Sequence, residues 1–178
     1  MTAYASMELV TERLVLRPLR VEDADAFYAM YVDPEVMRFM SGPFTGTVEQ
    51  LRERLAVRIV EHNRDGFGLM GTELRETGEL IGRCGHLRWT IEGREELEVG
   101  YLLGRRHWGN GYATEAARAL IDDGFARLGA HRIISLIHPQ NVASQRVAEH
   151  NGLRYERDIT VDGIPIAPIR LYSIDAAR

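Results

Sequence analysis

A glycine-rich turn around Gly109 and Gly111 carries the clearest chemistry in this sequence. Residues 106–115 read RHWGNGYATE, follow a strand-like run and open a strongly patterned helix. Glycines at a strand-to-helix turn allow positive φ and let the backbone approach a ligand closely. The first amides of a helix lack partners within the helix and lie at the positive end of its dipole. The turn therefore predicts a site for a phosphate or pyrophosphate, with the Thr114 hydroxyl as an added donor.

Two common phosphate-binding motifs do not fit this turn. The dinucleotide fingerprint needs GxGxxG in an early βαβ unit, with an acidic residue ~20 residues further on. A P-loop needs a Gly-Lys-Ser/Thr sequence, which does not follow Gly111. Taken alone, the segment could also be an ordinary turn between a strand and a helix.

A second segment makes the first one specific. Residues 138–153 read HPQNVASQRVAEHNGL. The two segments, in this order and at this separation, closely resemble the GNAT superfamily of acetyl-CoA-dependent N-acetyltransferases. The chain is most similar to the branch with the bacterial ribosomal-protein N-terminal acetyltransferases, because TERLVLRPL at 11–19 and DPEVMRF at 33–39 are typical of that branch. The resemblance extends from about residue 8 to about residue 174.

Length and composition limit the class of protein. The 178 residues are 45% hydrophobic and 27% charged, which predicts one globular domain over 1–178. The net charge of -4 argues against direct nucleic-acid binding and mildly favours a cationic substrate. The single cysteine, Cys84, excludes an internal disulfide and favours a reducing compartment. Without a signal region or a long apolar run, we expect a cytoplasmic protein with no membrane partner.

The hydrophobic pattern predicts an α+β domain. Strands are expected over 8–19, 67–74, 79–91, 95–104, 132–138, 153–161 and 166–174, and helices over 21–32, 47–64, 111–128 and 141–151. This order matches the GNAT fold, a mixed, mostly antiparallel twisted sheet of about seven strands flanked by four helices. The resemblance also makes a homodimer plausible.

The resemblance implies acetyl-CoA as the cosubstrate, with no metal. The pantetheine arm would pair like an added strand with the backbone of Leu102 and Leu103, so their strand must diverge from 132–138. Asn141 is either a helix N-cap or a contact of that arm, or both. The residues expected to bind the cofactor are Leu102, Leu103, Arg106, Gly109, Asn110, Gly111, Ala113, Thr114, Asn141 and Arg146.

Ser144 is the candidate donor to the departing thiolate. Many GNAT enzymes place a tyrosine seven residues after the helix-starting Asn, where this chain has Ala148. The ribosomal-protein branch uses a serine three residues after that Asn, which here is Ser144. The alternative is a serine that only satisfies the backbone at the start of a helix.

Glu98 is the candidate general base. An α-amino group with a pKa of ~7.7–8 is partly neutral at neutral pH, whereas a lysine amine with a pKa of ~10.4 needs a base. Related enzymes use a carboxylate on this strand, often through water. The alternative is that Glu98 is simply the solvent-facing member of an alternating strand.

The amine acceptor stays open at the level of sequence. Met37, Phe39 and Met40, in the loop over 33–46, could line its cleft together with Trp89, or could pack as a lip on the sheet. The acceptor could be the N-terminal amine of a ribosomal or other protein, or a small amine such as a polyamine, amino acid or aminoglycoside. We expect direct transfer in a ternary complex, because no well-placed nucleophilic cysteine is present. The alternative is a non-catalytic acetyl-CoA sensor that could dispense with Ser144 and Glu98.

Overall fold

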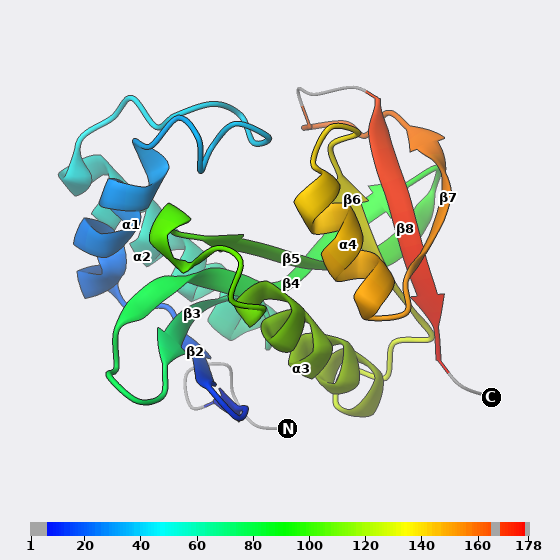
Figure 1. Ribbon diagram of the computed structural model, residues 1–178, viewed down its shortest axis with the longest axis horizontal. Coiled ribbons are helices and arrows are strands. Elements are labelled where there is room, and N and C mark those ends of the chain that lie inside the picture. The colour runs from blue at the N-terminus through cyan, green and yellow to red at the C-terminus, as the bar shows by residue number, and fades with distance from the viewer. Residues whose placement is uncertain (1–6, 165–167, 177–178) are drawn as a thin grey trace.

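Apolar residues at alternating or successive positions form the strands of a single sheet. The computed structural model describes residues 7–164 and 168–176. The sheet has eight strands in the order β1-β2-β3-β4-β5-β6-β8-β7 (Figure 1). The strands are Leu9–Val10 (β1), Leu14–Pro18 (β2), Leu69–Leu74 (β3), Leu80–Ile91 (β4), Arg94–Leu103 (β5), Arg132–Ile137 (β6), Arg154–Ile159 (β7) and Ile169–Asp175 (β8).

Helices cover both faces of this sheet. They are Ala24–Tyr31 (α1), Val48–Asp65 (α2), Tyr112–Ala126 (α3) and Val142–His150 (α4), with short 3-10 turns at Val21–Asp23 (η2) and Arg105–His107 (η3). One core joins α3 and α4 to the sheet, and a second core joins α1 and α2 to its other face. None of the described helices is long and apolar enough to cross a membrane.

The pairing of β5 with β6 is the exception within the sheet. All other neighbouring strands run antiparallel, whereas β5 and β6 are parallel and pair only at Leu97 with Ile133 and Glu98 with Ile134. Beyond this point β5 continues to Leu103 and β6 to Ile137, and the two strands separate (Figure 1). The expected divergence of these strands is therefore confirmed.

The expected elements are confirmed with two changes. The predicted strand over 8–19 is two strands, which makes eight rather than about seven, because a turn held by Thr11 folds β1 back onto β2. In this turn Thr11 N donates to Leu14 O, and Leu14 N donates to Thr11 Oγ1 at 3.0 Å. The predicted helix over 21–32 begins as a 3-10 turn. The predicted strand over 166–174 is observed from Ile169, and residues 166 and 167 lie outside the described part.

A buried ion-pair network ties the N-terminal strands together. The guanidinium of Arg17 on β2 is bidentate to Asp23, at 2.7 and 2.8 Å, and contacts Glu73 on β3 at 2.6 Å. Arg17 is only 3% exposed. Burial alone would lower the pKa of Arg17, but the two carboxylates outweigh burial and raise it above its ordinary value.

Removing Asp23 should therefore be costly. We expect Asp23→Ala to lower the free energy of unfolding by about 3–5 kcal/mol, because the Arg17 charge would stay buried without its main partner. Urea unfolding measures the change. Arg58→Ala, which removes an exposed pair with Glu61, is the control and should change stability by less than about 0.5 kcal/mol. A small loss in Asp23→Ala would contradict this account.

Candidate functional site

The glycine turn before α3 has the geometry of an anion site. Gly109 and Gly111 have φ of 77° and 79°, in the left-handed region that favours glycine. Gly111 is the N-cap of α3, and no side chain within the described part of the chain caps this end. The Asn110 side chain donates to the carbonyls of His107 and Trp108, at 3.2 and 3.1 Å, which stabilises the loop itself. The amides at the start of α3 are thus free of side-chain caps and suit an anion.

Two contacts hold the start of this turn. Trp108 Nε1 donates to Leu103 O at 2.8 Å, which fixes the turn to the end of β5. Arg106 forms an ion pair with Glu79, in the turn between β3 and β4. The guanidinium of Arg106, expected at a CoA phosphate, is therefore engaged by a carboxylate in this structure.

Glu115 clamps the β1–β2 turn onto the first turn of α3. Its carboxylate accepts hydrogen bonds from Thr11 Oγ1 at 2.6 Å, Arg13 N at 2.8 Å and Arg13 Nε at 2.7 Å. Arg13 also donates from NH1 to Asn110 O at 2.9 Å, so it reaches the glycine turn directly. Burial alone would raise the pKa of Glu115, but these hydrogen bonds outweigh burial and lower it.

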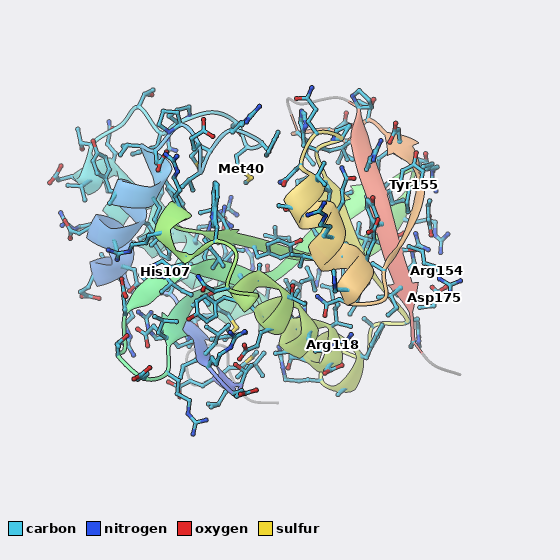
Figure 2. The ribbon with its side chains drawn as sticks, viewed as in Figure 1. Met40, His107, Arg118, Arg154, Tyr155 and Asp175 are labelled. Carbon is cyan, nitrogen blue, oxygen red and sulfur yellow. The ribbon has the colours of Figure 1, made fainter. Side chains whose placement is uncertain are left out.

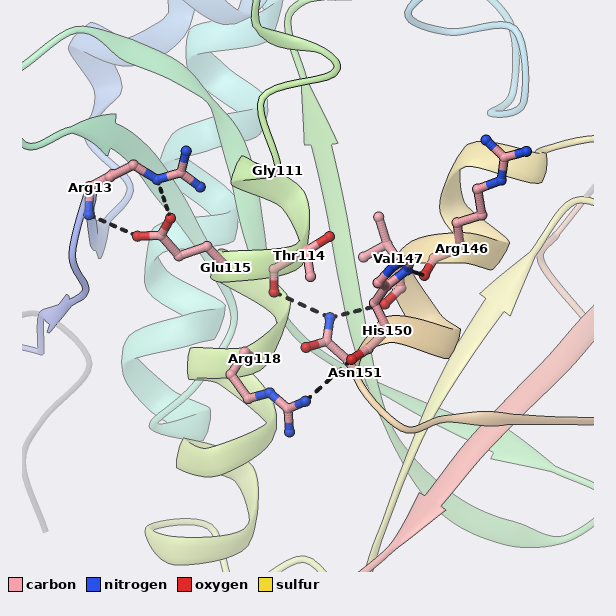
Figure 3. A pocket seen from close by; sticks show the side chains of 9 residues that line it. All are labelled: Arg13, Gly111, Thr114, Glu115, Arg118, Arg146, Val147, His150 and Asn151. Carbon is pink, nitrogen blue, oxygen red and sulfur yellow. Dashed lines mark hydrogen bonds and ion pairs between the residues drawn. The ribbon is translucent and has the colours of Figure 1, made fainter.

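A pocket of about 580 Å³ opens between α3 and α4 beside this clamp. Arginines from three parts of the chain line it, and Arg13 and Arg146 lie on opposite sides (Figure 3). Since Glu115 is paired with Arg13, the remaining charge of the pocket is positive and suits a polyanion. The lining residues are Arg13, Gly111, Thr114, Glu115, Arg118, Arg146, Val147, His150 and Asn151.

Asn151 joins the two helices at the floor of this pocket. Its Nδ2 donates to Thr114 O at 3.2 Å and to Val147 O at 3.0 Å (Figure 3). Asn151 is 1% exposed, and its Oδ1 has no hydrogen-bond partner within the described residues. Asn151 therefore holds α3 and α4 together beside the cationic groups of the pocket.

The separation of β5 from β6 leaves backbone groups of β5 facing an opening. Gly104 N donates to Ile81 O, so the backbone groups of Gly104 face β4. In an antiparallel pair this direction alternates from one residue to the next. The backbone N–H and C=O groups of residues 99, 101 and 103 therefore point away from β4. Ser135 Oγ donates to Val99 O at 2.9 Å, and the Leu103 carbonyl accepts from Trp108. Within the described residues, the backbone of Tyr101 and the N–H of Leu103 are therefore the groups that can pair with an added strand.

This register corrects one expectation about the pantetheine arm. Leu102 pairs with Arg83, so the backbone of Leu102 faces β4 and not the opening. Leu103 faces the opening as expected, with its N–H on that side. The backbone of Tyr101, and not that of Leu102, faces the opening because of the register of β5, which hydrophobic patterning alone does not define.

Glu98 is buried where β5 and β6 separate. It is 7% exposed, so the interpretation as a solvent-facing strand residue is wrong. Its Oε2 accepts from Trp89 Nε1 at 2.5 Å, and its Oε1 accepts from Leu136 N at 3.2 Å. Burial raises the pKa of Glu98, while the two hydrogen bonds and the charge of Arg83 oppose that rise. A buried carboxylate with a raised pKa has the properties of a general base.

Ser144 lies across the opening from β5, in the first turn of α4. Asn141 is the N-cap of α4, and its Oδ1 accepts from Ser144 N at 3.2 Å, which confirms the capping role. Tyr101 donates from its hydroxyl to Ser144 O at 3.1 Å, and burial raises the pKa of this tyrosine, which keeps it protonated. The Ser144 hydroxyl itself has no partner among the residues described and is available to a ligand.

The expected cleft residues do not form one group. Met37 packs against the core of α1 and α2, and Phe39 packs on the ring of His138 with centroids 5.0 Å apart. Met40 projects from the same loop and is 39% exposed (Figure 2). Trp89 lies apart from these, on β4 with its indole on Glu98.

Several residues of the site carry no signal in the sequence. Arg13 and Asn151 reach the pocket from segments distant in the chain from the glycine turn, and Tyr101 reads as an ordinary strand residue. The pairing of Glu115 with Arg13 depends on tertiary contacts, which the sequence around Glu115 does not indicate. Across residues 7–164 and 168–176, no three His, Cys, Asp or Glu side chains are grouped so that they could hold a metal.

Comparisons with known proteins agree with this geometry. The family described as "Acetyltransferase (GNAT) domain" matches residues 13–154. The uncharacterized protein YkkB of Bacillus subtilis is 40% identical, over 92% of this chain and 94% of that protein. The uncharacterized N-acetyltransferase p20 of Bacillus licheniformis is 37% identical, over 84% and 83%. A crystal structure of an acetyltransferase from Agrobacterium tumefaciens is 30% identical with a TM-score of 0.80, covering 96% and 95%.

The Glu115 clamp should make stability depend on pH. The lowered pKa means that the stabilisation is complete above the unfolded-state pKa of ~4.3 and is lost as pH falls through the folded-state value. Glu115→Gln should cost about 1 kcal/mol at pH 7, a modest loss because Arg13 is 44% exposed and solvent screens the pair. The difference from the native protein should close towards pH 3. Urea unfolding at both pH values measures it, with the exposed Glu149→Gln as control; a gap independent of pH would exclude the charged clamp.

Proposed function

The chain belongs to the GNAT family of acetyltransferases, and from that premise we propose that its site holds acetyl-CoA along α3 and β5 for direct transfer to a primary amine. Enzymes of this family use acetyl-CoA as cosubstrate for N-acetylation. The observation that carries the proposal is the pair of left-handed glycines, Gly109 and Gly111, at an uncapped helix start next to the separation of β5 and β6.

The pyrophosphate of acetyl-CoA would bind at the start of α3. Glycine at 109 and 111 leaves space for the phosphates, and the helix dipole adds to the binding of negative charge. The donors would be the backbone amides of Gly109, Asn110, Gly111, Ala113 and Thr114. The pantetheine amides would pair with the free backbone groups of Tyr101 and Leu103, with Asn141 beside them.

The adenosine 3′-phosphate end would lie in the cationic pocket. Arg118 and Arg146 line the pocket from α3 and α4, where two guanidinium groups can bind phosphate oxygens. Arg106, which is paired with Glu79, is not needed in this arrangement.

The transfer itself needs a base and a donor. Glu98 would accept a proton from the acceptor ammonium, directly or through water, so that the neutral amine can attack the thioester carbon. The new C–N bond forms as the C–S bond breaks, the thiolate leaves, and the nitrogen gives up its second proton to solvent. Ser144 would donate a hydrogen bond to the developing charge on sulfur and, with a proton from solvent, yield the free thiol.

The acceptor is a primary amine, either the N-terminus of a protein or a small molecule. Burial raises the pKa of Glu98 at the opening, which suits proton transfer and favours an enzyme over a non-catalytic sensor. Consumption of acetyl-CoA, followed across peptides with different N-termini and a panel of small amines, tests the function. No turnover with any amine, together with tight acetyl-CoA binding, would favour the sensor.

Gly111→Val should weaken acetyl-CoA binding at least tenfold, about 1.4 kcal/mol, because a branched side chain would stand where the phosphate approaches. Calorimetric titration measures the Kd. Gly129→Val is the matched control, since Gly129 also has a left-handed φ of 66° but lies at the far end of α3. It should carry the same backbone strain and keep its affinity. Equal affinities in two folded variants would place the pyrophosphate elsewhere.

Ser144→Ala should lower kcat by about 10- to 1,000-fold and leave the Kd of acetyl-CoA nearly unchanged. The reason is that a hydrogen bond to charge that develops only in the transition state acts on the chemical step. Steady-state kinetics with an acceptor from the amine screen, beside calorimetry, separates the two quantities. Native turnover in the variant would leave Ser144 with a structural role alone.

A further inference from the structure

Trp89 makes the shortest hydrogen bond to Glu98. The two residues lie on neighbouring strands, where Trp89 pairs with Glu96 and Glu98 pairs with Leu87. They are therefore diagonal neighbours on one face of the sheet, and the indole spans the distance to reach Oε2 at 2.5 Å. An indole N–H can only donate, so this contact favours the ionised carboxylate.

The second oxygen of Glu98 lies at the opening between the strands. Oε1 accepts from Leu136 N, the amide of β6 just beyond the last paired residues. An ionised carboxylate has about four acceptor positions, so two hydrogen bonds leave room for a further proton donor. The hydrogen bond from Trp89 to Oε2 fixes the orientation of the Glu98 carboxylate plane. Oε1 then faces the point where β5 and β6 separate.

We propose that Trp89 is a positioning residue for proton transfer: its indole fixes Oε2 of Glu98 and so directs Oε1 to the reacting amine. The inference rests on the proposed role of Glu98 as the base. It assigns to Trp89 a task other than lining the acceptor cleft.

Other charged and titratable groups surround this carboxylate. Arg83 on β4, which donates to Tyr31 of α1 at 2.6 Å, acts on Glu98 through its charge. Glu96 lies two residues earlier on β5 and is paired with Arg132 of β6. Tyr101 is buried nearby, and the Glu98 charge contributes to its raised pKa. None of these replaces the indole donor, so loss of Trp89 should shift Glu98 towards its neutral form.

The two tryptophans of the chain make a direct test available. The 15N-labelled indole resonances of Trp89 and Trp108 are assigned with Trp108→Phe, and followed over pH in the apo protein. The Trp89 resonance should titrate, and Glu98→Gln should abolish this titration. In Trp89→Phe, 13C-labelled glutamate should show the ionised fraction of Glu98 relative to its neutral form reduced about tenfold at a given pH. Trp108→Phe, which loses only a bond to Leu103 O, should leave Glu98 unchanged.

Kinetics then separates the positioning role of Trp89 from the role of Glu98 as the base. With an amine that supports turnover, the acid limb of kcat/KM should move to higher pH in Trp89→Phe, so that the rate falls about tenfold at low pH and recovers as pH rises. A Trp89 resonance that does not respond to Glu98, or an unmoved limb in Trp89→Phe, would overturn the role of Trp89. If Glu98→Gln keeps the native pH profile, the base assignment fails, whatever the resonances show.

Discussion

The separation of β5 from β6 is the constraint on which the site depends. Parallel strands that part inside a sheet leave backbone groups without partners, and buried groups of this kind are costly. Side chains replace the missing ladder here: Ser135 binds Val99 O, Glu98 binds Leu136 N, and Trp108 binds Leu103 O. Among the residues that the structure describes, the groups at the opening that keep no such partner are the backbone of Tyr101 and the N–H of Leu103. The candidate base is therefore also a structural element of the opening.

The glycine turn is held in place by contacts with two other parts of the fold. Trp108 ties it to β5, and the Glu115 clamp ties it to the β1–β2 turn through Arg13. Asn151 connects α3, which begins at the turn, to α4, which carries Ser144. The turn is therefore positioned by contacts from elsewhere in the fold, while the described residues give the start of α3 no side-chain cap.

Sequence patterns predicted most of the fold and part of the site. Periodicity located the helices and most strands, and the glycine turn, the Asn141 cap and the parting of the strands were all expected. The β1–β2 turn was missed because Thr11, Glu12 and Arg13 include neither glycine nor proline, the strongest turn signals. The register that turns Leu102 away from the opening, the burial of Glu98 and the approach of Arg13 depend on contacts distant in the chain. The acceptor, and the assignment to the ribosomal-protein branch, stay predictions because loops carry specificity.

The most direct test of the account is amide hydrogen exchange, resolved by residue, with and without acetyl-CoA. Pairing of the cofactor with the open edge of β5 should slow exchange at Tyr101 and Leu103, and binding of the pyrophosphate should slow exchange over residues 109–114. The edge strand β7 should exchange as before. Saturation with acetyl-CoA that leaves Tyr101 and Leu103 unprotected would contradict the claim that the opening between β5 and β6 receives the cofactor.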